Sequence, residues 1–165
     1  MVNIIVELSK YLMIVLMTVY TYLCFSIFGY QNPDKKKRML KRQNWIMFMI
    51  HIVAFMVMYL ETDDMKILVF YLMQVVLFGA TIILYTLIYP RVSRLVVNNM
   101  CMLLCIGMIM LTRLDYTKAF KQYIIAAGAI GLSLIVPVII RKFKLLSEWR
   151  LFYGIAGIVM LAVVV

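Results

Sequence analysis

Hydrophobic residues run along this chain in six long and nearly uninterrupted stretches. Their approximate bounds are 8–29, 45–60, 66–89, 95–112, 122–140 and 150–165. Inside them polar residues do not alternate with apolar ones, as they would in the strands of a membrane β-barrel. A helix that crosses a hydrocarbon layer of about 30 Å needs about 20 residues, and most of the stretches come close to that length. The pattern therefore predicts an all-α, polytopic bundle of about six transmembrane helices.

The last stretch is shorter than a full crossing. Leu151 to Val165 covers fifteen residues, and the run ends on three valines with no polar or aromatic flank. Because about 20 residues are needed, we expect the sixth helix to be truncated. The same observation predicts that the chain is the N-terminal part of a longer protein.

The composition favours a membrane protein over a soluble domain. Hydrophobic residues make up 66% of the chain and charged residues 15%, whereas a soluble domain has about a quarter charged residues. The net charge of +10 would suit nucleic acid, but the Lys and Arg residues lie in short connections between apolar stretches. Positive charge at that place orients membrane proteins and meets anionic lipid. We therefore expect the lipid bilayer as partner, and no nucleic acid.

The charges of the connections predict an orientation. The first, third and fifth connections (29–44, 90–94 and 141–150) carry twelve Lys and Arg residues, against five in the other connections and the N-terminus. The positive-inside rule places the richer side in the cytoplasm, so the N-terminus is expected outside. The fourth connection, 113–121, is then a basic segment on the outer side, which is suited either to an anionic head group or to plain solvation.

Few residues inside the stretches carry reactive chemistry. His51 is the single histidine and has no acidic residue at its depth, so a structural role is favoured over a functional one. Gln74, Asn98 and Asn99 are interpreted as hydrogen-bonding groups between helices. The three cysteines are interpreted as small packing residues, because no further ligands accompany them. No metal site, cofactor or disulfide framework is predicted.

Two segments in the second half of the chain carry a resemblance to a known family. The helix ending Gly107-Met108-Ile109-Met110-Leu111-Thr112-Arg113-Leu114-Asp115, followed by Ala119-Phe120-Lys121-Gln122, resembles the first core helix and the start of the second in FtsW/RodA/SpoVE (SEDS) proteins. The basic turn 141–149 and the helix after it continue the likeness. Residues 1–94 would be an N-terminal extension of three transmembrane helices, and residues 95–165 the first three core helices of an incomplete SEDS-like domain.

The resemblance implies a function and a set of partners. It implies the N-terminal part of a peptidoglycan glycosyltransferase that polymerises lipid II in division, elongation or sporulation. The full-length enzyme would lie in the bacterial plasma membrane beside a class B penicillin-binding transpeptidase. Arg113, Lys121 and Gln122 are the substrate-binding candidates.

The chain also departs from the family pattern. The family's Asn-Gly-Ala-type segment and its catalytic aspartate lie beyond the matching region, and Asp63, Asp64 and Asp115 do not correspond to that aspartate. No catalytic residue is therefore predicted in this chain, and whether the chain itself is an enzyme stays open. The alternative is a small multi-pass scaffold or transporter subunit without catalytic activity.

Overall fold

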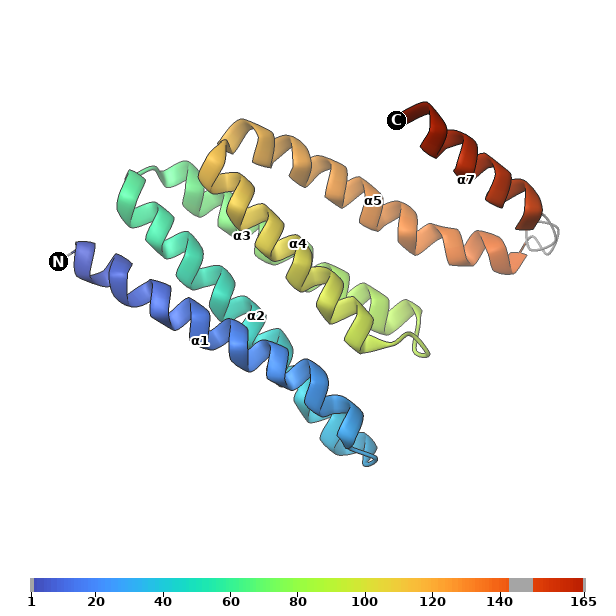
Figure 1. Cartoon of the computed structure of the whole chain (residues 1–165), viewed down its shortest axis with the longest axis horizontal. Helices are drawn as coiled ribbons and strands as arrows, with labels where there is room; N and C mark the ends of the chain where they lie inside the picture. Colours follow the sequence, from blue (N-terminus) through green and yellow to red (C-terminus); the bar gives the residue numbers. More distant parts are fainter. Residues whose placement is uncertain (1, 143–149, 165) are drawn as a thin grey trace. The chain divides into compact units, whose positions relative to one another are not determined.

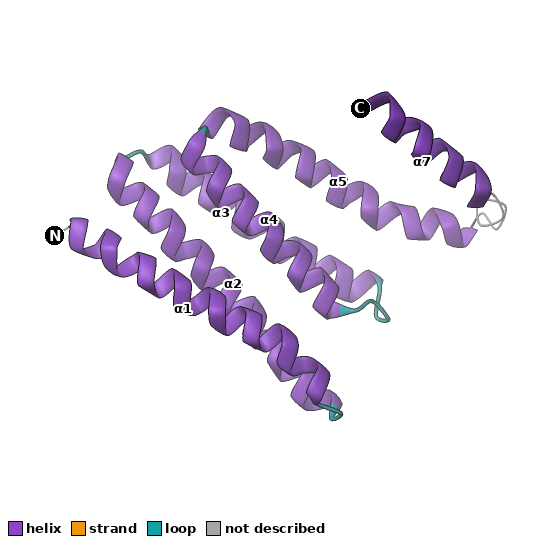
Figure 2. Ribbon diagram, in the orientation of Figure 1, coloured by secondary structure: helices purple, strands orange, loops and turns teal. Residues whose placement is uncertain are grey.

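The computed structural model describes residues 2–142 and 150–164. Over these ranges all regular structure is α-helical, which confirms the predicted fold class (Figures 1 and 2). The helices are α1 (Val2–Gly29), α2 (Pro33–Thr62), α3 (Met65–Ile88), α4 (Arg94–Leu114), α5 (Tyr116–Lys142) and α7 (Arg150–Val164).

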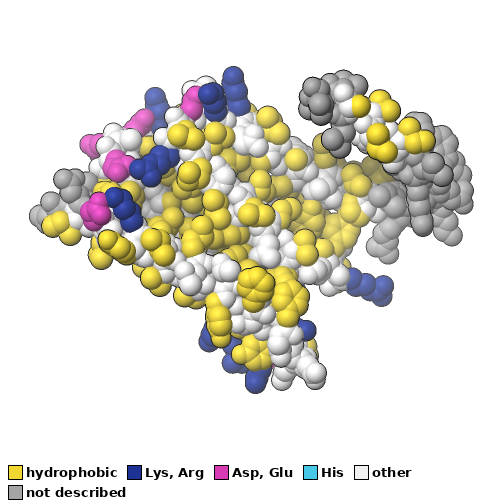
Figure 3. Space-filling model, in the orientation of Figure 1, with side chains coloured by type: hydrophobic (Ala, Val, Ile, Leu, Met, Phe, Trp, Pro, Cys, Tyr) yellow, Lys and Arg dark blue, Asp and Glu magenta, His cyan; other side chains and the backbone are white. Residues whose placement is uncertain are grey.

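Five of these helices, α1 to α5, are long and apolar enough to cross a membrane. Figure 3 shows hydrophobic side chains along the middle of the helices, while charged side chains gather toward helix ends. Helix α7 has 15 described residues, fewer than the about 20 needed for a crossing. The structure therefore shows a multi-pass membrane protein, and its orientation stays a prediction from the charges of the connections.

The chain divides into two compact units, Met1–Ile125 and Ala126–Val165. In the first unit α2 packs against α1, α3 and α4, and α3 also packs against α4. The second unit holds the rest of α5 and the helix α7. The division at residues 94 and 95 follows the family resemblance and stays a prediction. Most of the basic turn 141–149 lies outside the described residues.

The connection expected at 29–44 is mostly helix, so that boundary was wrong. Helix α2 begins at Pro33, twelve residues before the predicted span. The side chain of Asn32 accepts a hydrogen bond from the backbone N–H of Asp34 at 2.9 Å, and a proline at the first helical position suits its fixed φ. Lys and Arg are good helix formers. The basic segment is therefore a helical extension of the span, with its charges at fixed positions on the helix.

Two aspartates form the turn between α2 and α3. Asp63 adopts the left-handed conformation with φ of 52° and closes α2 through a 2.8 Å bond from its N–H to the carbonyl of Tyr59. The Oδ1 atom of Asp64 accepts from the N–H of Lys66 at 2.9 Å and so caps α3. Short polar side chains tolerate this conformation and satisfy free helix N–H groups. The role of the pair in the structure is to reverse the chain.

His51 lies in the packed interior of the first unit. It is fully buried, and its Nε2 lies 3.0 Å from Oε1 of Gln74 on α3. Its ring centroid lies 4.8 Å from that of Phe55 and 5.6 Å from that of Phe78. The contact joins α2 to α3, as expected of an interhelical hydrogen-bonding group such as Gln74. The structural role of His51 stays a prediction.

The core near this pair continues toward the start of α5. Phe55, Met58, Ile67, Phe70 and Ala119 form one buried cluster. The hydroxyl of Tyr123 donates to the backbone carbonyl of Met73 on α3 at 3.3 Å. These contacts attach the first turns of α5 to α2 and α3, and they fix the corner where α4 ends.

Candidate functional site

The corner between α4 and α5 consists of one non-helical residue, Asp115. Its extended backbone (φ −158°, ψ 107°) ends α4, and its N–H donates to the carbonyl of Leu111 at 2.9 Å. Its Oδ1 accepts from the N–H groups of Thr117 and Lys118, at 2.8 and 3.2 Å. A carboxylate at this position satisfies N–H groups that a helix start leaves free. The aspartate of the family-like segment thus shapes the turn.

The charge of Asp115 is favoured by the same contacts. The backbone N–H of Lys118, followed by that of Thr117 and the Lys118 ammonium, holds the pKa of Asp115 below its usual range. The ammonium lies 3.7 Å from Oδ2, with both side chains well exposed, so the pair is a weak surface interaction. The connection expected at 113–121 was too long, since Lys118 and Lys121 both lie on α5.

All three substrate-binding candidates are exposed, and two of them are cations near this corner. Arg113 lies in the last turn of α4, and Lys121 lies in the second turn of α5, with both residues accessible to solvent. With Lys118 they give the corner three cations within nine residues of sequence. Cations at a membrane surface attract phosphate and diphosphate groups.

Gln122 faces a different environment from its neighbour Lys121. It lines an open apolar groove of about 530 Å³ along α4. The other residues that line the groove are Met100, Leu103, Leu104, Gly107, Met108, Met110, Leu111 and Leu114. Gly107 leaves space on this face, because nothing lies within 4 Å of where a Cβ would stand. The structure thus places a polar amide at an apolar surface next to a cationic corner.

The sequence did not predict a chain of polar contacts that joins α1, α2 and α4. The hydroxyl of Tyr20 and the thiol of Cys24 both donate to Oδ1 of Asn99, at 3.0 and 3.2 Å. Gln43 donates to the Cys24 sulfur at 3.3 Å and accepts from Nδ2 of Asn98 at 3.3 Å. Asn98 and Asn99 therefore do bond between helices, as expected. Cys24, expected to be a packing residue, is a member of this polar chain.

The basic residues of α2 form a second candidate surface at the opposite end of the bundle. Lys37, Lys41 and Asn44 line a pocket with Arg94 of α4. Residues 37, 41 and 44 share one helix face by their spacing. That spacing would have indicated the surface, had the segment been predicted as a helix and not as a connection.

Replacing Asp115 with alanine should lower the midpoint of thermal unfolding by a few degrees, because α5 loses its cap. Asp115→Asn keeps an acceptor and should lose less. Since the folded-state pKa is lowered, the stability from the ionised carboxylate is present above the usual aspartate pKa. It is lost as the pH falls through the lower folded value. Circular dichroism melts of both variants against pH check this, and parallel pH profiles for the wild type and the Asp115→Asn variant would contradict it.

Chemically, the corner and groove together can hold an amphiphile with an anionic head and an apolar chain. Among the described residues no group of three His, Cys, Asp or Glu side chains could hold a metal ion. The chain matches no protein-family model, and neither curated proteins nor solved structures give a match.

Proposed function

We propose that this chain is the N-terminal part of a SEDS-type peptidoglycan glycosyltransferase that polymerises lipid II. The observation that carries the proposal is the segment from Gly107 to Gln122, in which the family-like residues form one corner between two membrane helices. The proposal places the full-length protein in a bacterial plasma membrane, paired with a class B penicillin-binding transpeptidase.

The chemistry of the corner supports a substrate of this kind. Lipid II carries a diphosphate between a sugar head and a long polyprenyl chain. Arg113 and Lys121 supply exposed positive charge near the end of α4, and diphosphate oxygens are strong acceptors for such groups. The groove that Gln122 lines lies along α4 and is otherwise apolar. A polyprenyl chain is the occupant that fits this combination of cationic end and apolar wall.

The orientation predicted from loop charges also supports it. The positive-inside rule places the 113–121 segment outside, although it carries three cations. Polymerisation of lipid II takes place on that side. In the proposal this chain binds and orients the lipid carrier, and the reacting carboxylate belongs to a later part of the protein.

The test is complementation of a depletion strain by the full-length gene. Lys121→Ala should impair growth and reduce polymer formation from labelled lipid II at least about tenfold, because one phosphate contact is lost. Membrane levels of the variant should stay normal, since Lys121 is exposed. Arg113→Gln is expected to act in the same direction.

Lys66→Ala is the matched control. Lys66 is an exposed lysine at the start of α3, on the same predicted side of the membrane and outside the family-like segment. It should leave growth and polymer formation unchanged. Normal growth with Lys121→Ala and Arg113→Gln combined would remove the substrate-site proposal and favour the non-catalytic scaffold or transporter subunit.

A further inference from the structure

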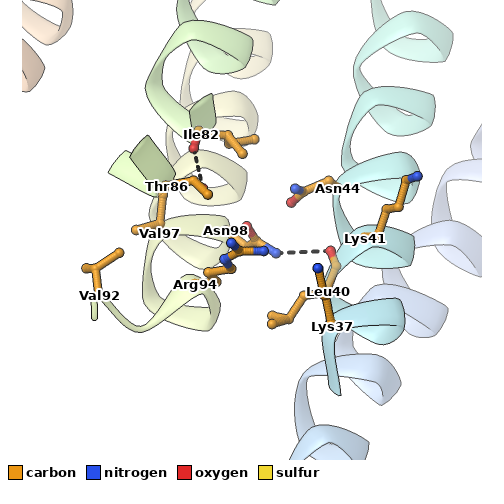
Figure 4. A pocket seen from close by; sticks show the side chains of 10 residues that line it. All are labelled: Lys37, Leu40, Lys41, Asn44, Ile82, Thr86, Val92, Arg94, Val97 and Asn98. Carbon is orange, nitrogen blue, oxygen red and sulfur yellow. Dashed lines mark hydrogen bonds between the residues drawn. The ribbon is translucent and has the colours of Figure 1, made fainter. Parts of the chain in front are cut away.

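A basic pocket lies between the ends of α2, α3 and α4 that are expected to face the cytoplasm. Its volume is about 160 Å³. Lys37 and Lys41 come from α2 and Arg94 from α4, on opposite walls (Figure 4). None of the described residues that line it is acidic. Three basic residues from two helices that are distant in sequence therefore line one pocket.

An exposed tryptophan indicates that the pocket lies near the depth of lipid head groups. Trp45 directly follows Asn44 of the pocket wall and is 62% exposed. Exposed tryptophan marks the interface between hydrocarbon and water in membrane proteins. The long Lys37 and Lys41 side chains lie within about two and a half turns of this position on the same helix. Phosphate groups of the bilayer would lie at the same level.

The pocket wall holds a buried polar atom that a hydroxyl of a ligand could pair with. Asn98 is fixed in place, since its Nδ2 donates to the carbonyl of Leu40 at 3.2 Å (Figure 4). The buried Oδ1 of Asn44 has no hydrogen-bond partner among the described residues. A buried acceptor is costly when left unpaired. The hydroxyl of a glycerol head group could donate to it while the phosphate contacts the cations.

We propose that this pocket binds a phosphate ester, and that the ester is the head group of an anionic phospholipid. Basic pockets between transmembrane helices at the cytoplasmic surface suit such head groups. Two sources share this chemistry, the lipid and a soluble phosphate ester. Apolar residues also line the wall, Leu40 and Val97 among them, and they favour the lipid. The proposal is independent of glycosyltransferase activity.

The experiment uses the full chain in a neutral detergent, where no charged bilayer contributes. Binding of phosphatidylglycerol is titrated by native mass spectrometry and by thermal stabilisation. Lys37→Gln with Lys41→Gln should weaken binding about 25-fold, since each cation close to a lipid phosphate contributes about a factor of five. Diacylglycerol, which lacks the phosphate, should not stabilise the protein.

The matched control removes the same charge from the same helix. Arg38 and Arg42 are exposed residues of α2 with the same spacing as the lysine pair and do not line the pocket. Arg38→Gln with Arg42→Gln should change the affinity less than about threefold. Equal weakening of phosphatidylglycerol binding in the two double variants would overturn the proposal that the phosphate binds in this pocket.

A further variant and a further ligand complete the test. Asn44→Asp removes no cation, and its new negative charge should weaken phosphatidylglycerol binding through repulsion of the phosphate. Unchanged binding by this variant would contradict the site. Glycerol 3-phosphate, which has no acyl chains, should bind much more weakly than the lipid. Equal binding would support the phosphate site and overturn its assignment to a lipid.

Discussion

Phe70→Ala should lower the free energy of unfolding by about 3 kcal/mol. Phe70 is fully buried, and its ring centroid lies 5.4 Å from that of Tyr116 and 5.8 Å from that of Tyr123. Lipid removes most of the hydrophobic driving force between helices, so packing contacts carry more of the stability. An alanine would leave a cavity where α2, α3 and α5 meet. Unfolding by sodium dodecyl sulfate in mixed micelles measures the loss.

Phe25→Ala is the control for this prediction. Phe25 on α1 is 71% exposed, so its ring faces the detergent or lipid in the folded protein and loses little on truncation. We expect the control to cost less than about 1 kcal/mol. Similar losses in the two variants would contradict the interior role of Phe70.

The second large effect concerns His51 and Gln74. His51→Leu or Gln74→Leu alone should destabilise the protein by about 2 kcal/mol, because each leaves its partner buried without its 3.0 Å hydrogen bond. The double variant should cost no more than either single one. Nδ1 of His51 and Nε2 of Gln74 lack partners among the described residues, so an apolar pair also removes two unpaired atoms.

The four proteins form a double-mutant cycle, measured by the same unfolding method. We expect an interaction free energy of at least about 2 kcal/mol between the two positions, since the double variant should cost no more than one single variant. Additive losses would show that the two side chains do not act as a pair.

The fold was predictable because lipid imposes one strong constraint on the sequence. Every backbone group inside the hydrocarbon must be paired, so long apolar runs become helices. The ends of the helices were less predictable. Pro33 is the first residue of α2, and Asp115 directly precedes α5 and caps it. The charged residues next to these positions favour a helix by their propensity, whereas their low hydropathy predicts a connection.

The candidate sites depend on which residues of different helices contact one another. The hydropathy pattern of the sequence gives no information about these contacts. Gln122 and Lys121 are neighbours in sequence, yet the first lines the groove along α4 and the second does not. In the sequence Cys24 is interpreted as a packing residue, whereas in the structure its thiol donates a hydrogen bond to Asn99. In the sequence Arg94 only contributes to the charge count that sets the orientation, whereas in the structure it lines a pocket together with Lys37. Such pairs arise from helix packing and need three-dimensional information.

The polar chain through α1, α2 and α4 has a consequence for biosynthesis. The partners Tyr20 and Asn99 are 79 residues apart in sequence. When the first two helices emerge from the ribosome, α4 does not yet exist, and the polar atoms that will contact it have no permanent partner. The hairpin of α1 and α2 therefore enters the bilayer with unfinished polar contacts, and α4 completes the bundle after its own insertion. We therefore expect membrane insertion of this hairpin to precede the final assembly of the bundle.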